Sequence, residues 1–244
     1  MWSAIAVAAL VSAPAFGQAL AFEVASVKPS TATSSPVTGA GPNDPVTFTA
    51  HVMTLKLLIA SAYDVPDFQI SGGPVWAASD RFDIDAKAGS PSTPSQKLVM
   101  LRTLLTDRFQ LAFHHEQSTL RAYALVVAKD GSKIHPAREG DPVPALLPGT
   151  LPVRGMKQLT SILNVYLRLN MQFPSTGEPP LSEPEPLPVI DQTGLTGDYN
   201  TVLDLRRSRD WFVVLEQQLG LRLEARKVPV EMLVIDNAVK PLAN

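Results

Sequence analysis

The chain of 244 residues contains no cysteine. Disulfide bridges, thiol nucleophiles, thiolate zinc sites and iron–sulfur clusters are therefore excluded as sources of stability or chemistry. The formal net charge is -2, so the chain has neither the basic excess typical of nucleic-acid binding nor an acidic tail. A chain of this length buries enough surface to fold without a disulfide or a metal. The composition predicts an ordinary globular protein with no nucleic-acid partner.

Long hydrophobic runs are also missing, apart from one short stretch near the N-terminus. Ile5–Ala13 consists almost entirely of small apolar residues and is followed by a proline. Such a run is typical of a secretory signal peptide, because a bilayer span needs about 20 apolar residues. Small residues suit cleavage after Ala19, although Met1–Ser3 lacks the usual positive charge. We expect an exported protein with residues 1–19 as signal peptide and no membrane span after its removal; a buried N-terminal helix is the alternative.

Periodicity predicts a first group of helices and strands between residues 22 and 129. Phe82, Ile84 and Ala86 alternate with polar residues, which indicates a half-buried strand. Leu55 and Leu58 share one helical face, with Thr54 as the expected N-cap. The pattern predicts strands at 22–29, 48–52, 80–87, 110–117 and 122–129, helices at 54–63 and 98–109, and a loop rich in Ser, Thr, Gly and Pro at 30–45.

The same order of elements returns from about Leu151, and long-period self-similarity is a strong architectural signal. We therefore expect a duplication, with units at 20–145 and 146–244 that pack with pseudo-two-fold symmetry; one compact domain over 20–244 is the alternative. The predicted class is α+β, with two pseudo-symmetric helix–strand–helix–strand–strand units and mainly antiparallel sheets covered by helices. The matching segments are 151–159 with 48–55, 198–204 with 81–85, 221–227 with 111–116 and 230–236 with 123–129, and a proline-rich loop lies at 173–188. A helix is also predicted at 211–219, with Gly220 as its expected C-cap.

Few side chains stand in a pattern that carries chemistry. His114 and His115 are neighbours on a predicted strand, where successive side chains point to opposite faces, so they do not chelate one ion. Asp83 and Asp85 share a strand face and suit acid–base work or Ca²⁺, but the solvated face of a half-buried strand is the simpler interpretation. The sequence has no nucleophile elbow and no phosphate-binding loop. We expect no catalytic residue, no metal site and no cofactor.

Five motifs stand in order along the chain: Phe22–Pro29, Gln69–Trp76, Ser79–Lys87, Leu104–Leu111 and Pro188–Tyr199. Together they resemble the soil-associated family known as domain of unknown function 3738, and the likeness runs from Phe22 almost to the C-terminus. Members of that family are typically exported proteins of soil bacteria, and some are joined to membrane metallopeptidases of the β-lactam-sensor type. The resemblance implies a location outside the cytoplasm and a sensing or binding role, and it carries no catalytic residues.

Two functions follow as hypotheses. The first is a non-catalytic periplasmic or secreted binding module for a small molecule, a cell-wall fragment or a protein partner, with a ligand at the seam between the two halves. The second is a hydrolase of an extracellular or cell-wall substrate that uses Asp83, Asp85, His114 and Glu116. A partner-binding scaffold is a third option, and it predicts an exposed apolar patch or an unpaired sheet edge. The expected ligand-binding residues are Gly72, Gly73, Trp76, Asp191, Thr193 and Gly194.

Overall fold

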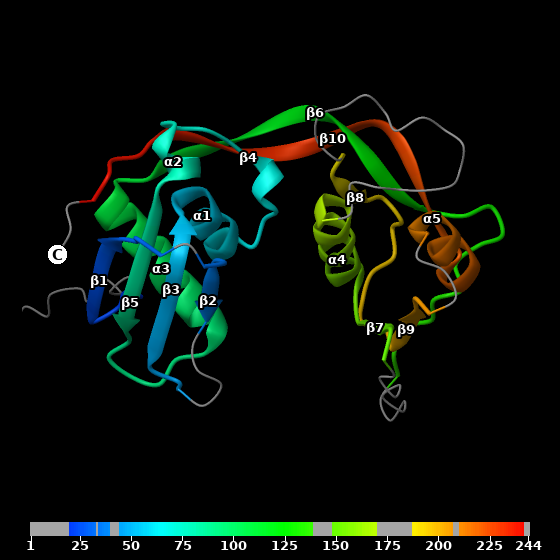
Figure 1. Ribbon diagram of the computed structural model, residues 1–244, viewed down its shortest axis with the longest axis horizontal. Helices are drawn as coiled ribbons and strands as arrows, with labels where there is room; N and C mark the ends of the chain where they lie inside the picture. Colours follow the sequence, from blue (N-terminus) through cyan, green and yellow to red (C-terminus); the bar gives the residue numbers. More distant parts are fainter. Residues whose placement is uncertain are drawn as a thin grey trace, which may run out of the picture. The chain divides into compact units, whose positions relative to one another are not determined.

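The computed structural model confirms the α+β class. It describes residues 20–32, 34–39, 44–138, 148–169, 187–206 and 210–241. The described residues form five α-helices and three sheets, which are antiparallel or mixed (Figure 1). The predicted signal peptide at 1–19 and most of the proline-rich loop predicted at 173–188 lie outside the described residues.

The chain divides into two compact units. Unit 1 comprises the chain up to His114 together with the segment from Val234 onward, and unit 2 comprises His115–Leu233. Unit 2 is therefore one continuous segment, whereas unit 1 is built from two segments far apart in the sequence.

Unit 1 contains a four-stranded antiparallel sheet in the order β1-β5-β3-β2. Phe82, Ile84 and Ala86 of β5 are buried on one face, and the residues between them face the other way. This is the alternation that the sequence predicted, and it arises because successive strand residues point to opposite faces. The strands are β1 (Val24–Pro29), β2 (Val37–Gly39), β3 (Thr47–Thr54) and β5 (Arg81–Lys87).

Two helices of unit 1 begin at well-formed caps. The backbone N–H of Leu57 donates to Thr54 Oγ1 at 3.2 Å, which confirms the predicted N-cap of the first helix. At the start of the second helix, Thr93 and Gln96 form a reciprocal capping box, and the proline between them occupies the first turn. The remaining elements of unit 1 are α1 (Leu55–Tyr63), η1 (Asp67–Gln69), β4 (Ile70–Gly72), α2 (Trp76–Ser79) and α3 (Pro94–Phe109).

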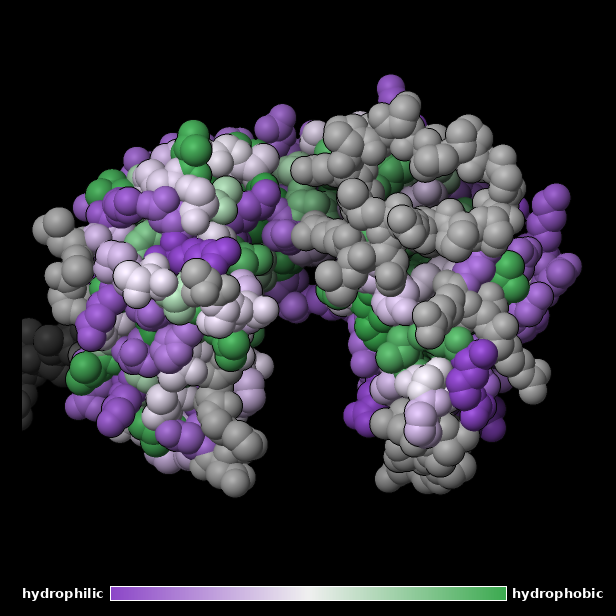
Figure 2. All heavy atoms as spheres, viewed as in Figure 1, coloured by the Kyte–Doolittle hydropathy of each residue, from purple (hydrophilic) through white to green (hydrophobic). Residues whose placement is uncertain are grey.

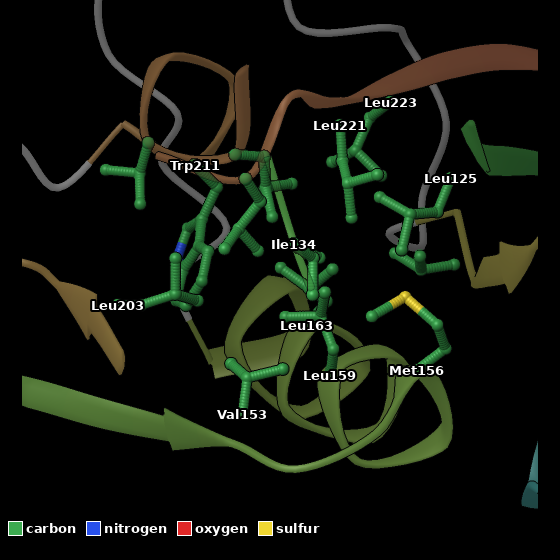
Figure 3. Close-up of a cluster of buried hydrophobic side chains, with 14 of the residues drawn as sticks. Leu125, Ile134, Val153, Met156, Leu159, Leu163, Leu203, Trp211, Leu221 and Leu223 are labelled. Atoms are coloured by element: carbon green, nitrogen blue, oxygen red, sulfur yellow. The ribbon is translucent and has the colours of Figure 1, made fainter. Parts of the chain in front are cut away.

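Unit 2 packs its helices and short strands around an apolar core (Figure 3). Leu159 and Leu163 of α4 are fully buried there, beside Trp211 and Leu221. The predicted helix Trp211–Leu219 is confirmed, with its second half in π-helical form and Gly220 as its C-cap at φ 64°. The elements are β7 (Thr150–Val153), α4 (Met156–Leu169), β8 (Val189–Asp191), β9 (Thr201–Asp204), α5 (Trp211–Val214) and η2 (Leu215–Leu219).

Two long strands replace what the sequence predicted as two strand–turn–strand pairs. The turn expected between 110–117 and 122–129 is wrong, because β6 (Ala112–Val127) runs through it without interruption. The same is true of 221–227 and 230–236, which form β10 (Leu221–Asn237). A tight hairpin needs residues at positive φ, and Glu116–Arg121 contains no Gly, Asn or Asp to supply them. Extended backbone is therefore the easier conformation for this segment.

The long strands lie at the centre of a sheet with the order β4-β10-β6-β8. In unit 2, β8 pairs with β6 in parallel, with Tyr123 opposite Val189 and Leu125 opposite Asp191. In unit 1, β4 lies beside the end of β10, where Gly72 faces Ile235. Most of β6 and β10 lies in unit 2, while the start of β6 and the end of β10 lie in unit 1.

Candidate functional site

The six residues expected to bind a ligand fall into two groups, one in each unit. Gly72, Gly73 and Trp76 lie in unit 1, between β4 and α2. The other three, Asp191, Thr193 and Gly194, lie in unit 2 at the end of β8 and in the turn after it. Their part in ligand binding stays a prediction.

The two glycines of unit 1 allow a close approach of main chains. Gly72 and Gly73 adopt φ values of 72° and 75°, which favour glycine. A Cβ on Gly72 would lie 2.8 Å from the carbonyl oxygen of Ile235, and one on Gly73 would lie 2.9 Å from Ile235 Cγ2. Trp76 stacks on Phe109 with ring centroids 6.5 Å apart. These three residues therefore fix how β4 and α2 pack within unit 1.

Asp191 and Thr193 of unit 2 build a turn. Asp191 Oδ1 accepts from the backbone N–H of Thr193 at 2.9 Å and from its hydroxyl at 2.7 Å. Thr193 Oγ1 accepts from the backbone N–H of Leu195 at 3.1 Å. Gly194 follows at φ 69°, with no atom within 4 Å of where its Cβ would stand. Such side-chain to backbone bonds are typical of Asx and ST turns.

Two of the three candidate carboxylates of the hydrolase hypothesis, Asp83 and Asp85, contact β3. Asp83 Oδ1 accepts from the backbone N–H of Val52 at 2.8 Å, and Asp85 Oδ1 lies 2.8 Å from His51 Nε2. Val52 has φ 59°, an uncommon value for a β-branched residue, and the register of β3 shifts between Ala50 and Met53. This β-bulge leaves one N–H without a ladder partner, and Asp83 satisfies it.

Sequence reasoning missed both the bulge and His51. One signal was present, since Val52 and Met53 are consecutive apolar residues that interrupt the alternation of β3. Both side chains are buried as a result, while His51 stays on the outer face of the sheet. The side chains of His51 and Asp85 are 46% and 59% exposed, so a ligand in solvent can reach the pair.

The candidate histidines His114 and His115 form separate pairs, as their strand positions predicted. His114 Nδ1 lies 2.8 Å from Asp236 Oδ1, and His115 Nδ1 lies 3.0 Å from Glu231 Oε1. Glu116 is exposed on the same strand. Among the described residues, no group of three or more His, Asp or Glu side chains is placed to hold a metal ion.

The outer face of the unit 1 sheet is the most polar feature that the strands organise. Ser26 of β1 and Thr49 of β3 both lie opposite Asp85 of β5, which gives a row of three polar residues across the sheet. Lys28 stands opposite Asp83 in the next row. We call the side chains of Ser26, Lys28, Thr49, His51, Asp83, Asp85 and Lys87 the open face.

Large exposed apolar side chains are scattered. In Figure 2 the coloured surface of unit 1 is mostly purple to white, with separate green spots. No helix among the described residues is long and apolar enough to cross a membrane. The exposed large apolar residues of the described part are Leu20, Val24, Val37, Val75, Val99, Val165 and Val239.

The most strongly shifted carboxyl group has a local cause. Hydrogen bonds from the Thr47 side chain and from the backbone N–H groups of Thr47 and Val46 lower the pKa of Asp44 to about 2. The ammonium of Lys97, a buried residue, donates to the carbonyl oxygens of Asp44 and Thr47 at 2.9 and 2.8 Å. A hydrogen bond from Lys240 lowers the pKa of Asp80 in a similar way. Both carboxylates hold a chain segment in place.

Comparison with known proteins identifies a family. No curated protein and no solved structure matches the chain. A family model described as "Protein of unknown function (DUF3738)" matches residues 56–238, which include all of α1 but its first residue, both long strands and all six predicted ligand-binding residues. The matched segment covers most of the chain and agrees with the resemblance of its motifs, so this protein belongs to the DUF3738 family.

Proposed function

We propose that this protein is a non-catalytic binding or sensing module that works outside the cytoplasm, and that the open face of unit 1 contacts its ligand. One observation carries the proposal: the sheet displays His51, fixed by Asp85 at 2.8 Å, beside the row of Ser26, Asp85 and Thr49. The hydroxyls and the imidazole can donate or accept hydrogen bonds, the carboxylate accepts them, and all of these groups stand on a four-stranded sheet. Recognition sites gain precision when they are built on strands.

Export is part of the proposal and rests on the sequence. The apolar run Ile5–Ala13 and the small residues up to Ala19 support a cleaved signal peptide. Expression in a bacterial host, followed by mass spectrometry of the periplasmic fraction, tests it. A mature protein that starts near Leu20 supports export, and an uncleaved protein in the cytoplasm contradicts it.

We also propose that the two halves are pseudo-symmetric copies of one unit. If the short helices η1, α2 and η2 are left aside, the order β3, α1, β4, β5, α3, β6 matches β7, α4, β8, β9, α5, β10. In both sets the first and fourth elements pair antiparallel, as β3 with β5 and β7 with β9. The repeated unit is strand–helix–strand–strand–helix–strand, because each long strand replaces the two strands expected at its end.

A thermal-shift screen of the protein from Leu20 onward tests the binding function. The panel contains divalent metals, cell-wall fragments, sugars and β-lactams, and a ligand at 100 times its Kd adds about 2.7 kcal/mol of stability. For a ligand found in this way, His51→Ala and Thr49→Ala should abolish the shift, and Glu116→Ala, an exposed change on another strand, should not. A ligand whose shift survives both open-face variants places the site elsewhere, and a blank screen counts against small-molecule binding.

A hydrolase of an extracellular or cell-wall substrate is the second candidate. The observation that favours it is the same pair, because a carboxylate that orients an imidazole next to serine and threonine hydroxyls suits general-base chemistry. Product release from cell-wall fragments that disappears in both His51→Gln and Asp85→Asn would support hydrolysis. Product release that is unaffected by these variants would remove the pair from any catalytic role.

A further inference from the structure

The units differ in how the chain builds them. Unit 2 is the continuous segment His115–Leu233, while unit 1 needs both the chain before His115 and the chain after Leu233. Unit 2 is thus inserted into unit 1 in the sequence. The two long strands β6 and β10 carry the chain into unit 2 and back out.

Unit 2 contains everything that its own core requires. Its buried cluster comes entirely from residues 115–233, including Leu125 of β6 and Leu221 of β10 (Figure 3). The pairing of β6 with β8 also lies within this segment. The main chain closes locally as well, since the backbone N–H of Ala128 donates to the carbonyl oxygen of Gly220 at 2.8 Å.

Unit 1 is completed by the returning chain. The end of β10 lies against β4 so closely that a Cβ on Gly72 would stand 2.8 Å from the Ile235 carbonyl oxygen. Asn237 Nδ2 donates to the Gln110 carbonyl oxygen at 3.1 Å, and the backbone N–H of Val239 donates to the Phe109 carbonyl oxygen at 2.7 Å. His114 pairs with Asp236 beside them. If unit 2 unfolded, these contacts would have to close a loop formed by all of residues 115–233, at an entropic cost that folded unit 2 removes.

We propose that unit 1 folds only when unit 2 is folded, whereas unit 2 folds without unit 1. The dependence follows from chain connectivity. Folded unit 2 holds β6 and β10 side by side, so the segments of unit 1 before His115 and after Leu233 start close together. A ligand that stabilises unit 2 therefore also protects unit 1.

Two tryptophans report on the units separately in the full-length chain. Trp76 lies in unit 1 against Phe82 and Phe109, and Trp211 is buried in unit 2 against Tyr166. With Trp2→Phe in both, Trp211→Phe leaves the unit 1 reporter and Trp76→Phe leaves the unit 2 reporter. Urea unfolding is then followed by fluorescence in each reporter.

Core truncations in each unit give the test. Unit 2 is weakened by Val214→Ala, by Leu163→Ala and then by both, until the Trp211 midpoint falls below the unaltered Trp76 midpoint. The proposal expects the Trp76 midpoint to fall with it and never to exceed it. A variant in which Trp76 reports folded unit 1 while Trp211 reports unfolded unit 2 overturns the dependence.

The reciprocal change tests the other half of the proposal. Leu58→Ala removes a fully buried side chain of unit 1, and Ile59→Val is the milder version if the first does not fold. The Trp76 midpoint should fall while the Trp211 midpoint stays within experimental error. An equal fall of both midpoints would overturn the claim that unit 2 folds without unit 1.

Discussion

The two units make the same junction, from a helix through a left-handed cap into a long strand, with different residues. In unit 1, α3 ends at Gln110 with φ 48° before β6, and in unit 2, η2 ends at Gly220 with φ 64° before β10. A Cβ on Gly220 would lie 2.1 Å from the carbonyl oxygen of Gly131, whereas Gln110 is exposed. The comparison teaches that glycine is required where the cap is packed, not wherever φ is positive.

The edges of the β3–β5 pair in unit 1 and of the β7–β9 sheet in unit 2 are covered differently. In unit 1, β5 and β3 are flanked by β1 and β2. The β7–β9 sheet of unit 2 has two strands, and side chains modify its edges. Gln218 accepts from the N–H of Asp204 in β9 and donates to its carbonyl oxygen, both at 2.8 Å, and Pro152 in β7 has no N–H to offer. In unit 1, neighbouring strands cover the edges of β3 and β5, whereas in unit 2 the Gln218 amide bonds the edge of β9 and Pro152 removes a donor from β7.

The largest expected loss of stability is at the packed Gly220 cap. Gly220→Ala forces Cβ against Gly131 and should lower the free energy of unfolding by about 3 kcal/mol or more. The matched control is Gly194→Ala, a positive-φ glycine of unit 2 with open space around it, which should cost about 1 kcal/mol. Urea unfolding followed by circular dichroism measures both.

Gln110→Gly places a glycine at the exposed cap of unit 1 and tests whether a positive φ alone requires one. Glycine relieves the positive φ but adds freedom to the unfolded chain, so we expect a change within about 1 kcal/mol. Equal losses for Gly220→Ala and Gly194→Ala would contradict the packing argument.

The amide at the β9 edge should matter next most. Gln218→Leu leaves the N–H and C=O of Asp204 without these partners, which should cost about 2 kcal/mol. Gln217→Leu makes the same chemical change at an exposed neighbouring position and should cost less than about 0.5 kcal/mol. If both variants unfold at the same urea concentration, the amide does not close the edge.

The β-bulge of unit 1 provides the next contrast. Asp83→Ala removes the acceptor of the Val52 N–H and should cost about 1 to 2 kcal/mol. Asp85→Ala breaks an exposed pair with His51 and should cost less than about 1 kcal/mol. A reversed order in urea unfolding would mean that the exposed pair, not the bulge contact, stabilises this sheet.

The smallest expected effect depends on pH. The pKa of Asp44 is lowered from 3.8 to about 2, so its charged form adds stability that is full above pH 3.8 and lost as the pH falls through about 2. Asp44→Asn should therefore lower the urea midpoint at pH 6 and match the unaltered protein near pH 2. The cost of Gln218→Leu, a neutral group, should not follow this curve. A constant difference for Asp44→Asn across the range would show that its charge is not involved.

The sequence predicted most local structure because local rules dominate there. The alternation of Phe82 and Ile84, the Thr54 cap and the Gly220 cap follow from periodicity and cap preferences, and all three are confirmed. The continuity of β6 was mispredicted. A short turn is predicted between Gln117 and Ala122, but this segment contains none of the Gly, Asn or Asp residues that a tight turn favours.

Features that depend on residues far apart in the sequence could not be predicted from the sequence. The bond from Val52 to Asp83 joins residues 31 apart, and the close approach of Gly72 to Ile235 joins opposite ends of the family domain. The sequence marked Gly72 and Asp191 as special but not what surrounds them. It left out His51, because a single histidine on a strand gives no signal until a carboxylate is placed beside it.

Hydrogen exchange at Glu116–Arg121 tests the central structural claim most directly, since both long strands and the inserted unit depend on an unbroken β6. Mass spectrometry of peptides from the full-length protein compares these amides with those of Ala122–Val127 in the same strand. A continuous strand predicts protection of the same order in both segments. Rapid exchange at Glu116–Arg121 beside slow exchange at Ala122–Val127 would restore the turn and contradict the account.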